Sequence, residues 1–445
     1  MANVNGMRMP TTADLMSMWN ASGLKEKLIF TFVMLIAFRF GIHLPVFGIN
    51  NEIFARIASG NNILGFLDLF SGGALGKVSI FALGIGPYIT SSIIMQLLTI
   101  AIPQLEEMQR DGEDGRKKIA AITRYVTVVL ALVESTAMAI GFGRGGLLED
   151  FNALNIILVI AALTAGSAFL MWVGERITEN GIGNGISIVL TINIISRVPQ
   201  DLKALYDQFI LNKSIAKGAV AAIIILAVIA AMVVIVIVLN DGVRKIPVQY
   251  AKKMQGRKMV GGQTTNIPLR VNTAGVIPVI FASSLMQFPV IICSFFNYNG
   301  TGVWSQILKG LSSNNWCNPN QPIYSIGLLV YIILVVFFAY FYTSITFNPL
   351  EIADNMKKQG GFIPGIRPGK PTSDYLSRIL NYIVFIGAVG LIIVCVLPFF
   401  FNGVFGAQVS FGGTSLIIIV SVVLETIKQI ESQMLVRNYK GFLNE

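Results

Sequence analysis

Charged side chains are scarce in this chain of 445 residues. Asp, Glu, Lys and Arg make up 13% of it, whereas soluble domains carry about 25%. Apolar residues make up 54%, and they occur in runs long enough to cross a bilayer, which takes about 20 residues. The composition therefore excludes a soluble multidomain protein and indicates a protein with several membrane spans.

Histidine and cysteine are also nearly absent. His43 is the only histidine, so no histidine-based catalytic dyad and no His/Cys metal cluster can be assembled. Cys293, Cys317 and Cys395 form no disulfide framework and are expected to be free thiols. The glycines of residues 181–185 (GIGNG) lack the βαβ unit of a nucleotide-binding loop and predict a tight turn between spans. We therefore expect no enzymatic activity, no metal and no cofactor.

Two stretches of the sequence occur twice. Residues 84–96 read GIGPYITSSIIMQ and residues 275–287 read GVIPVIFASSLMQ, so that their prolines align. Residues 185–190 likewise resemble residues 413–418. A proline removes a backbone donor and loosens a helix. Helices interrupted at corresponding places in two halves of a chain are the best sequence indication of a transport path.

Hydropathy predicts ten spans, at residues 25–44, 76–101, 118–142, 153–176, 183–198, 217–239, 270–296, 323–347, 377–401 and 412–432. The repeated stretches pair the second span with the seventh and the fifth with the tenth, so each repeat holds five spans. Because an odd number of spans reverses the direction of entry, we expect an all-α polytopic membrane protein with two inverted five-helix repeats around a central pore.

The same spans define the expected domains. These are a cytoplasmic N-terminal segment (1–23), a first half (24–200), an outer connection (201–216), a second half (217–432) and a cytoplasmic C-terminal tail (433–445). The Lys and Arg residues concentrate in segments that are internal if the N-terminus is cytoplasmic, above all 240–270 and 348–378. The net charge of +10 could indicate nucleic-acid binding, but cations in short loops between apolar runs are typical of membrane orientation.

Several segments resemble those of one known family. Residues 70–98, 177–188, 271–284, 361–372 and 411–416 are similar to the SecY family, the channel subunit of the bacterial Sec protein translocase. The likeness extends from about Leu24 to the C-terminus. It implies a channel of the bacterial cytoplasmic membrane that translocates unfolded secretory polypeptides and releases transmembrane segments sideways into the lipid bilayer. It implies as partners SecE and SecG, the SecA motor ATPase, the ribosome, signal sequences and nascent polypeptides, with the energy supplied by the ATPase or the ribosome.

Residues 61–73, before the second span, are too short to cross a bilayer. By pattern alone, an interfacial helix on the outer surface fits this segment as well as any other structure. The family resemblance instead implies a short re-entrant plug helix that includes Leu64, Phe66, Leu67, Phe70, Ser71, Gly72 and Gly73.

The repeated midplane positions carry only apolar residues, and the resemblance implies that they form a pore ring: Ile85, Ile89, Ile186, Leu190, Ile280 and Ile418. The alternative for each alone is ordinary packing. The alternative for the whole chain is a coupled solute transporter, since those proteins also have inverted repeats and broken helices. Transporters usually place ionisable residues near the midplane. Here Arg39 and Glu134 are the clear intramembrane candidates, and both lie outside the repeated stretches.

Serine and glutamine are four residues apart on both the second and the seventh span, so each pair shares one helix face. We interpret Ser92, Gln96, Ser283 and Gln287 as a lateral gate. The alternative is ordinary interhelical packing, in which such polar contacts contribute about 0.6 kcal/mol each.

The two long basic loops contain signs of ordered structure. Alternation at Ile246, Val248 and Tyr250 predicts a short hairpin in residues 244–258 of the first loop. Glycines and prolines frame an exposed tip in residues 348–378. Solvated basic loops would suffice for membrane orientation. Ordered turns that present cations are suited to docking on an acidic or RNA surface. The resemblance assigns contacts with the ribosome and SecA to Arg257, Lys258 and Arg367.

Overall fold

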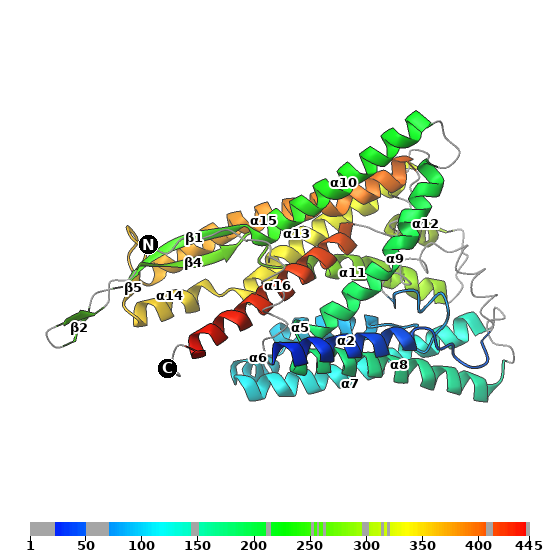
Figure 1. Cartoon of the computed structure of the whole chain (residues 1–445), viewed down its shortest axis with the longest axis horizontal. Coiled ribbons are helices and arrows are strands. Elements are labelled where there is room, and N and C mark those ends of the chain that lie inside the picture. The colour runs from blue at the N-terminus through cyan, green and yellow to red at the C-terminus, as the bar shows by residue number, and fades with distance from the viewer. Residues whose placement is uncertain are drawn as a thin grey trace. The chain divides into compact units, whose positions relative to one another are not determined.

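The structure of the chain is a computed structural model (Figure 1). It describes residues 23–49, 71–143, 151–210, 215–250, 253–255, 258–260, 264–295, 302–312, 316–317, 321–405 and 413–441. The helices are α2 (Leu24–Gly41), α5 (Gly86–Ala101), α6 (Pro103–Arg110), α7 (Glu113–Phe142), α8 (Ala153–Asn180), α9 (Gly185–Phe209), α10 (Ile215–Asp241), α11 (Ile277–Phe295), α12 (Val303–Leu311), η3 (Pro322–Ser325), α13 (Ile326–Thr346), α14 (Pro349–Lys358), α15 (Lys370–Phe405) and α16 (Gly413–Gly441). The strands are β1 (Val243–Tyr250), β2 (Lys253–Gln255), β3 (Lys258–Val260), β4 (Thr264–Arg270) and β5 (Gly361–Phe362).

Each of the ten predicted spans contains a helix. Within the described residues, five helical stretches are long and apolar enough to cross a membrane alone: 113–141, 153–180, 222–241, 322–358 and 370–401. Helices α5 and α6 would make a sixth span if counted as one, but they meet at a bend of 105°. The chain is therefore an all-α polytopic membrane protein, in which α5 and α6 form one sharply bent pair.

The predicted start of the second span is wrong. Residues 76–85 form turns, and the helix begins only at Gly86. Gly84 has a left-handed backbone with φ of 59°, and Pro87 occupies the first turn of α5, where its missing N–H has no partner to lose. Hydropathy could not locate this boundary, because the turn residues before it are as apolar as those of the helix.

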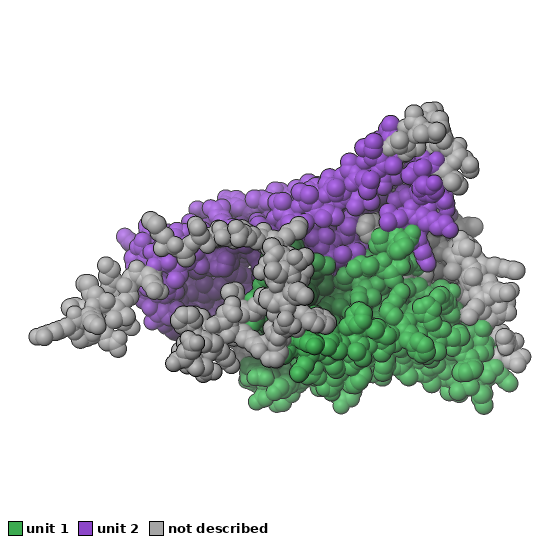
Figure 2. Space-filling view, in the orientation of Figure 1, with its two compact units in different colours: residues 1–199, 295–297, 422–445 green, residues 200–294, 298–421 purple. Residues whose placement is uncertain are grey.

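The chain divides into two compact units (Figure 2). The first contains residues 1–199, 295–297 and 422–445, and the second contains residues 200–294 and 298–421. In the first unit α7 packs on both α5 and α8. Part of its core lies between the turns before α5 and helices α7 and α8, and consists of Val46, Ile49, Leu75, Val78, Ala82, Met138, Ala139, Val159 and Leu163.

The second unit combines packed helices with a small sheet. Helix α15 packs against α10, α13 and α14. Strand β1 pairs antiparallel with β4 on one side and with β5 on the other. A hairpin forms as predicted, but its return strand is β4 at residues 264–270, beyond the predicted segment. Ile246 and Val248 are buried beneath the sheet. They belong to a core that the sheet shares with α14 and α15. Its other buried residues are Leu269 of β4, Met356 of α14, Ile363 after β5, and Leu376, Ile379 and Ile383 of α15.

Candidate functional site

The first repeated stretch has the same conformation in both units. The aligned glycines, Gly84 and Gly275, have φ angles of 59° and 63°, in the left-handed region that favours glycine. Each is followed two residues later by the start of a helix, α5 or α11, whose second residue is the aligned proline. The repeated sequence therefore marks a place where a span changes from irregular backbone to helix.

The second repeated stretch also begins a helix in each copy, since α9 starts at Gly185 and α16 at the aligned Gly413. In the first unit the turn between α8 and α9 is tight, as predicted. Oδ1 of Asn184 accepts hydrogen bonds from the backbone N–H groups of Ile186 at 3.2 Å and Ser187 at 3.3 Å. These bonds satisfy donors that an uncapped helix would leave without a partner.

All six candidate pore residues lie at these helix starts. Ile85 is the N-cap of α5, and the others fall within the first two turns of their helices. Ile85, Ile89, Ile186 and Leu190 belong to the first unit, and Ile280 and Ile418 to the second. The side chain of Ile186 packs against Gly174 of α8. A Cβ on Gly174 would lie 2.8 Å from Cγ1 of Ile186, so position 174 has no room for a larger residue. Each unit thus carries apolar side chains at the starts of two helices.

The end of the candidate plug is held inside the first unit. Ser71 Oγ accepts a hydrogen bond from the backbone N–H of Leu75 at 3.1 Å. Gly72 has φ of 69°, and a Cβ there would lie 2.5 Å from Oδ1 of Asn193, a buried residue of α9. Gly73 is also left-handed, with φ of 87°. The other proposed plug residues, Leu64, Phe66, Leu67 and Phe70, lie outside the described residues.

The candidate gate residues bond within their own helices. Nε2 of Gln96 donates to Ser92 Oγ at 3.5 Å, which agrees with a shared face. Ser283 Oγ donates to the carbonyl oxygens of Val279 at 2.8 Å and Ile280 at 3.1 Å. Gln287 lies in α11, but its side chain is outside the described part.

Sequence reasoning missed two polar residues that fix the interrupted helices. Ser91 Oγ donates to the carbonyl oxygen of Thr123 at 2.8 Å and so ties α5 to α7. Asn193 fills the space beside Gly72. The available signal was a polar residue within an apolar run, but the sequence does not reveal which residue it contacts.

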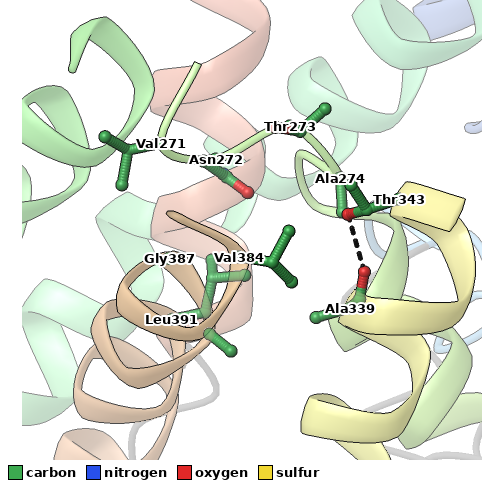
Figure 3. Close-up of a pocket in the computed structure, with 10 residues that line it drawn as sticks. Val271, Asn272, Thr273, Ala274, Ala339, Thr343, Val384, Gly387 and Leu391 are labelled. Carbon is green, nitrogen blue, oxygen red and sulfur yellow. Dashed lines mark hydrogen bonds between the residues drawn. The ribbon is translucent and has the colours of Figure 1, made fainter. Parts of the chain in front are cut away.

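The start of α11 is tied to the second unit by a polar chain. Nδ2 of Asn272 donates to Oδ1 of Asn240 at 2.9 Å, and Nδ2 of Asn240 donates to Ser421 Oγ at 2.7 Å. The backbone N–H of Val271 donates to the carbonyl oxygen of Gly242 at 2.8 Å. A small pocket lies beside this turn (Figure 3) and is lined by Val271, Asn272, Thr273, Ala274, Ala339, Thr343, Val384, Gly387, Ala388 and Leu391.

The basic loops form one structure rather than two. Strand β5, from the second loop, pairs with β1 of the first, with Gln249 opposite Phe362. Ile363 is buried in the core beneath this sheet, and the exposed Arg367 follows in a tip framed by Gly365 and Gly369. Thr372 Oγ1 donates to the carbonyl oxygen of Arg367 at 2.8 Å, which fixes the backbone of the tip.

The remaining proposed docking residues are less fully described. Lys258 begins β3, but its side chain lies outside the described part, and Arg257 is not among the described residues. The described residues contain no group of three or more His, Cys, Asp or Glu that could hold a metal ion. Arg39 lies in α2 and Glu134 in α7, so neither occupies an interrupted helix start.

Comparisons with known proteins agree with this architecture. The SecY family profile matches residues 79–427. The chain belongs to the SecY family. A Streptomyces galbus protein named protein translocase subunit SecY is 45% identical over 94% of this chain and 97% of its own length.

Solved structures share the fold. One described as the structure of a protein conducting channel has a TM-score of 0.61 at 21% identity, and covers 92% of this chain and 93% of its own. Sec61 in the canine ribosome-channel complex from the endoplasmic reticulum has a TM-score of 0.59 at 20% identity, over 92% of this chain and 93% of its own.

Proposed function

We propose that this SecY-family chain is a protein-conducting channel, which passes unfolded secretory polypeptides across the membrane and releases transmembrane segments sideways into lipid. The observation that carries the proposal is the matched pair of helix starts in each unit, which carry apolar residues. Together with membership of the SecY family, this arrangement supports a pore ring of Ile85, Ile89, Ile186, Leu190, Ile280 and Ile418.

An apolar ring has the properties that such a pore requires. It offers an ion no hydrogen bond, so a narrow constriction loses its water and blocks ions. A translocating polypeptide supplies its own bulk and fills the gap. Apolar side chains form no hydrogen bonds with a passing polypeptide. Polypeptides of different sequence can therefore slide through the ring without being held. A site for one solute would need the opposite, a fixed set of polar partners.

Substituting Ile280 and Ile418 together by Asn tests the proposal against a solute transporter. Polar groups should let water and ions into the ring, so the resting ion conductance should rise. Export of a substrate with a defective signal sequence should improve, because the closed state loses apolar contacts. Matched Asn substitutions at Leu329 and Ile333, exposed on α13, control for general damage. Unchanged conductance and export would mean that Ile280 and Ile418 are ordinary packing residues.

The plug and gate assignments belong to the same proposal. The contact of Gly72 with Asn193 supports a re-entrant segment, since α9 is a predicted span and a surface helix would not reach it. The hydrogen bond from Gln96 to Ser92 supports a polar stripe on α5. Such weak polar contacts, at about 0.6 kcal/mol each, would let α5 and α11 part when an apolar segment leaves the pore.

The chain is proposed to hydrolyse nothing itself and to receive energy from a partner. The sheet formed by both basic loops supports docking, because it holds Arg367 on a fixed, exposed tip. The chemistry of this face fits an acidic motor protein or ribosomal RNA, and we assign it to SecA and the ribosome. SecE and SecG are the proposed membrane subunits, and the bacterial cytoplasmic membrane, with both termini cytoplasmic, is the proposed location.

A further inference from the structure

Helix α12 (Val303–Leu311) is short, amphipathic and uncovered on its apolar side. Val303, Trp304 and Ile307 have exposed fractions of 74%, 52% and 44%. These three side chains share one face with Leu308 and Leu311, whereas Ser305, Gln306 and Lys309 occupy the opposite face. A soluble surface would rarely expose Trp and Ile together on so short a helix, so this face indicates an apolar partner.

The far end of α12 is fixed to a membrane-spanning helix. Nε1 of Trp316 donates to the carbonyl oxygen of Gly310 at 2.8 Å. The Trp316 ring packs on those of Tyr331 in α13 and Phe399 in α15, with centroids 5.4 Å and 4.9 Å away. A Cβ on Gly327, at the start of α13, would clash with the same carbonyl of Gly310. Helix α12 is thus anchored at the end of α13 rather than hanging from a loose loop.

The helices that follow α12 also expose apolar side chains. Ile323 of η3 and Ile326, Leu329 and Ile333 of α13 are all exposed. Apolar side chains exposed on a candidate span suit the hydrocarbon of a bilayer. Helix α12 and the sheet of β1, β4 and β5 lie at opposite ends of the long helices of the second unit (Figure 1). Helix α12 therefore lies at one end of an apolar candidate span, away from the basic loops.

We propose that α12 lies in the membrane–water interface and anchors the end of α13 there. That end is the outer leaflet in the orientation proposed above, on which this leaflet assignment rests. Trp304 has the amphipathic ring that favours the headgroup level, and Val303 and Ile307 reach the upper acyl chains. Lys309 lies on the opposite, polar face of the helix. The partner is lipid, and not a second protein chain.

Depth-dependent fluorescence quenching tests this proposal. In a chain with its three cysteines replaced, single cysteines at Ile307, Gln306 or Leu329 are labelled with an environment-sensitive fluorophore. The full chain is then reconstituted in phosphatidylcholine–phosphatidylglycerol vesicles. The Ile307 label should be quenched about twofold more by lipid with a spin label near the headgroup than near the chain end. The Leu329 label should show the reverse preference, and the Gln306 label should be quenched by aqueous iodide.

Two outcomes would overturn the proposal. Equal iodide quenching at Ile307 and Gln306 would place α12 in water. Protection of the Ile307 label from both iodide and lipid quenchers would show that a protein chain, such as a second copy, covers it. If the cysteine-free chain does not fold, W304F with native cysteines gives the same information, because it should remove a component of tryptophan fluorescence that shallow lipid quenchers reach. Loss of no such component would equally contradict the proposal, and neither outcome depends on polypeptide transport.

Discussion

Gly72 and Gly73 share a left-handed backbone but differ in their surroundings. A Cβ on Gly72 would meet Asn193, whereas nothing lies within 4 Å of one on Gly73. Both G72A and G73A should therefore lose about 1–2 kcal/mol through backbone strain, and G72A should lose a further 1–3 kcal/mol or so through overpacking. Thermal unfolding in detergent should rank G72A below G73A and both below the parent. Equal losses would mean that Asn193 does not fix the end of the plug.

Arg367 should matter through its charge and not through the fold, because its side chain is exposed. R367E replaces an attraction for an acidic or RNA surface by a repulsion, so motor-driven export should fall by about tenfold or more while the protein still inserts normally. K118E makes the same charge reversal at an exposed position outside the sheet and should export normally. Normal export by R367E would remove Arg367 from the docking surface.

The sequence alone predicts the glycines and prolines at which a helix is interrupted. Gly84, Gly275 and the two aligned prolines could be recognised as interruptions because few other residues permit those conformations. Asn193 could not be connected with Gly72, since the contact joins positions far apart in the chain. The type of a residue indicates which backbone conformation it favours. It does not indicate which distant neighbour restricts the space around that residue.

Among the elements, the sheet of β1, β4 and β5 joins two loops that the sequence presents as separate. Gln249 and Phe362 are opposite each other across β1 and β5. Antiparallel partners have Cα atoms about 4.5–5.5 Å apart, within the range that a disulfide can bridge. In a cysteine-free chain, the pair Q249C and F362C should therefore form a disulfide under mild oxidation, detected by gel mobility after cleavage between the loops.

A matched pair controls for random collisions between the loops. Q249C with R367C places the second cysteine in the same loop but outside the strand, so it should crosslink far more slowly. Equal rates for the two pairs would mean that β5 does not hold a fixed register on β1. The hairpin of β1 and β4 could be predicted because alternation is local. The β5 pairing could not, because two residues carry no periodic pattern.

In the whole molecule, the duplicated sequence corresponds to duplicated local structure, with the same left-handed glycine and the same helix start in each unit. A helix in each of the ten predicted ranges could be predicted because apolar runs of about 20 residues have few alternatives in a bilayer. The true start of the second span could not, because hydropathy does not distinguish an apolar turn from an apolar helix. The family could be recognised from the motifs, whereas the sheet that joins the two basic loops depends on a pairing between distant residues.

The central claim is that a translocating polypeptide passes the interrupted helix starts of both units. It is tested most directly by placing a photo-crosslinking amino acid at Ile85, at Ile280 or at Ile223, in three separate variants. Ile223 is an exposed apolar residue on α10 and serves as the control. With a secretory chain stalled during export, the account predicts crosslinks to that chain from Ile85 and from Ile280, and none from Ile223. Crosslinks from Ile223 but from neither Ile85 nor Ile280 would contradict it.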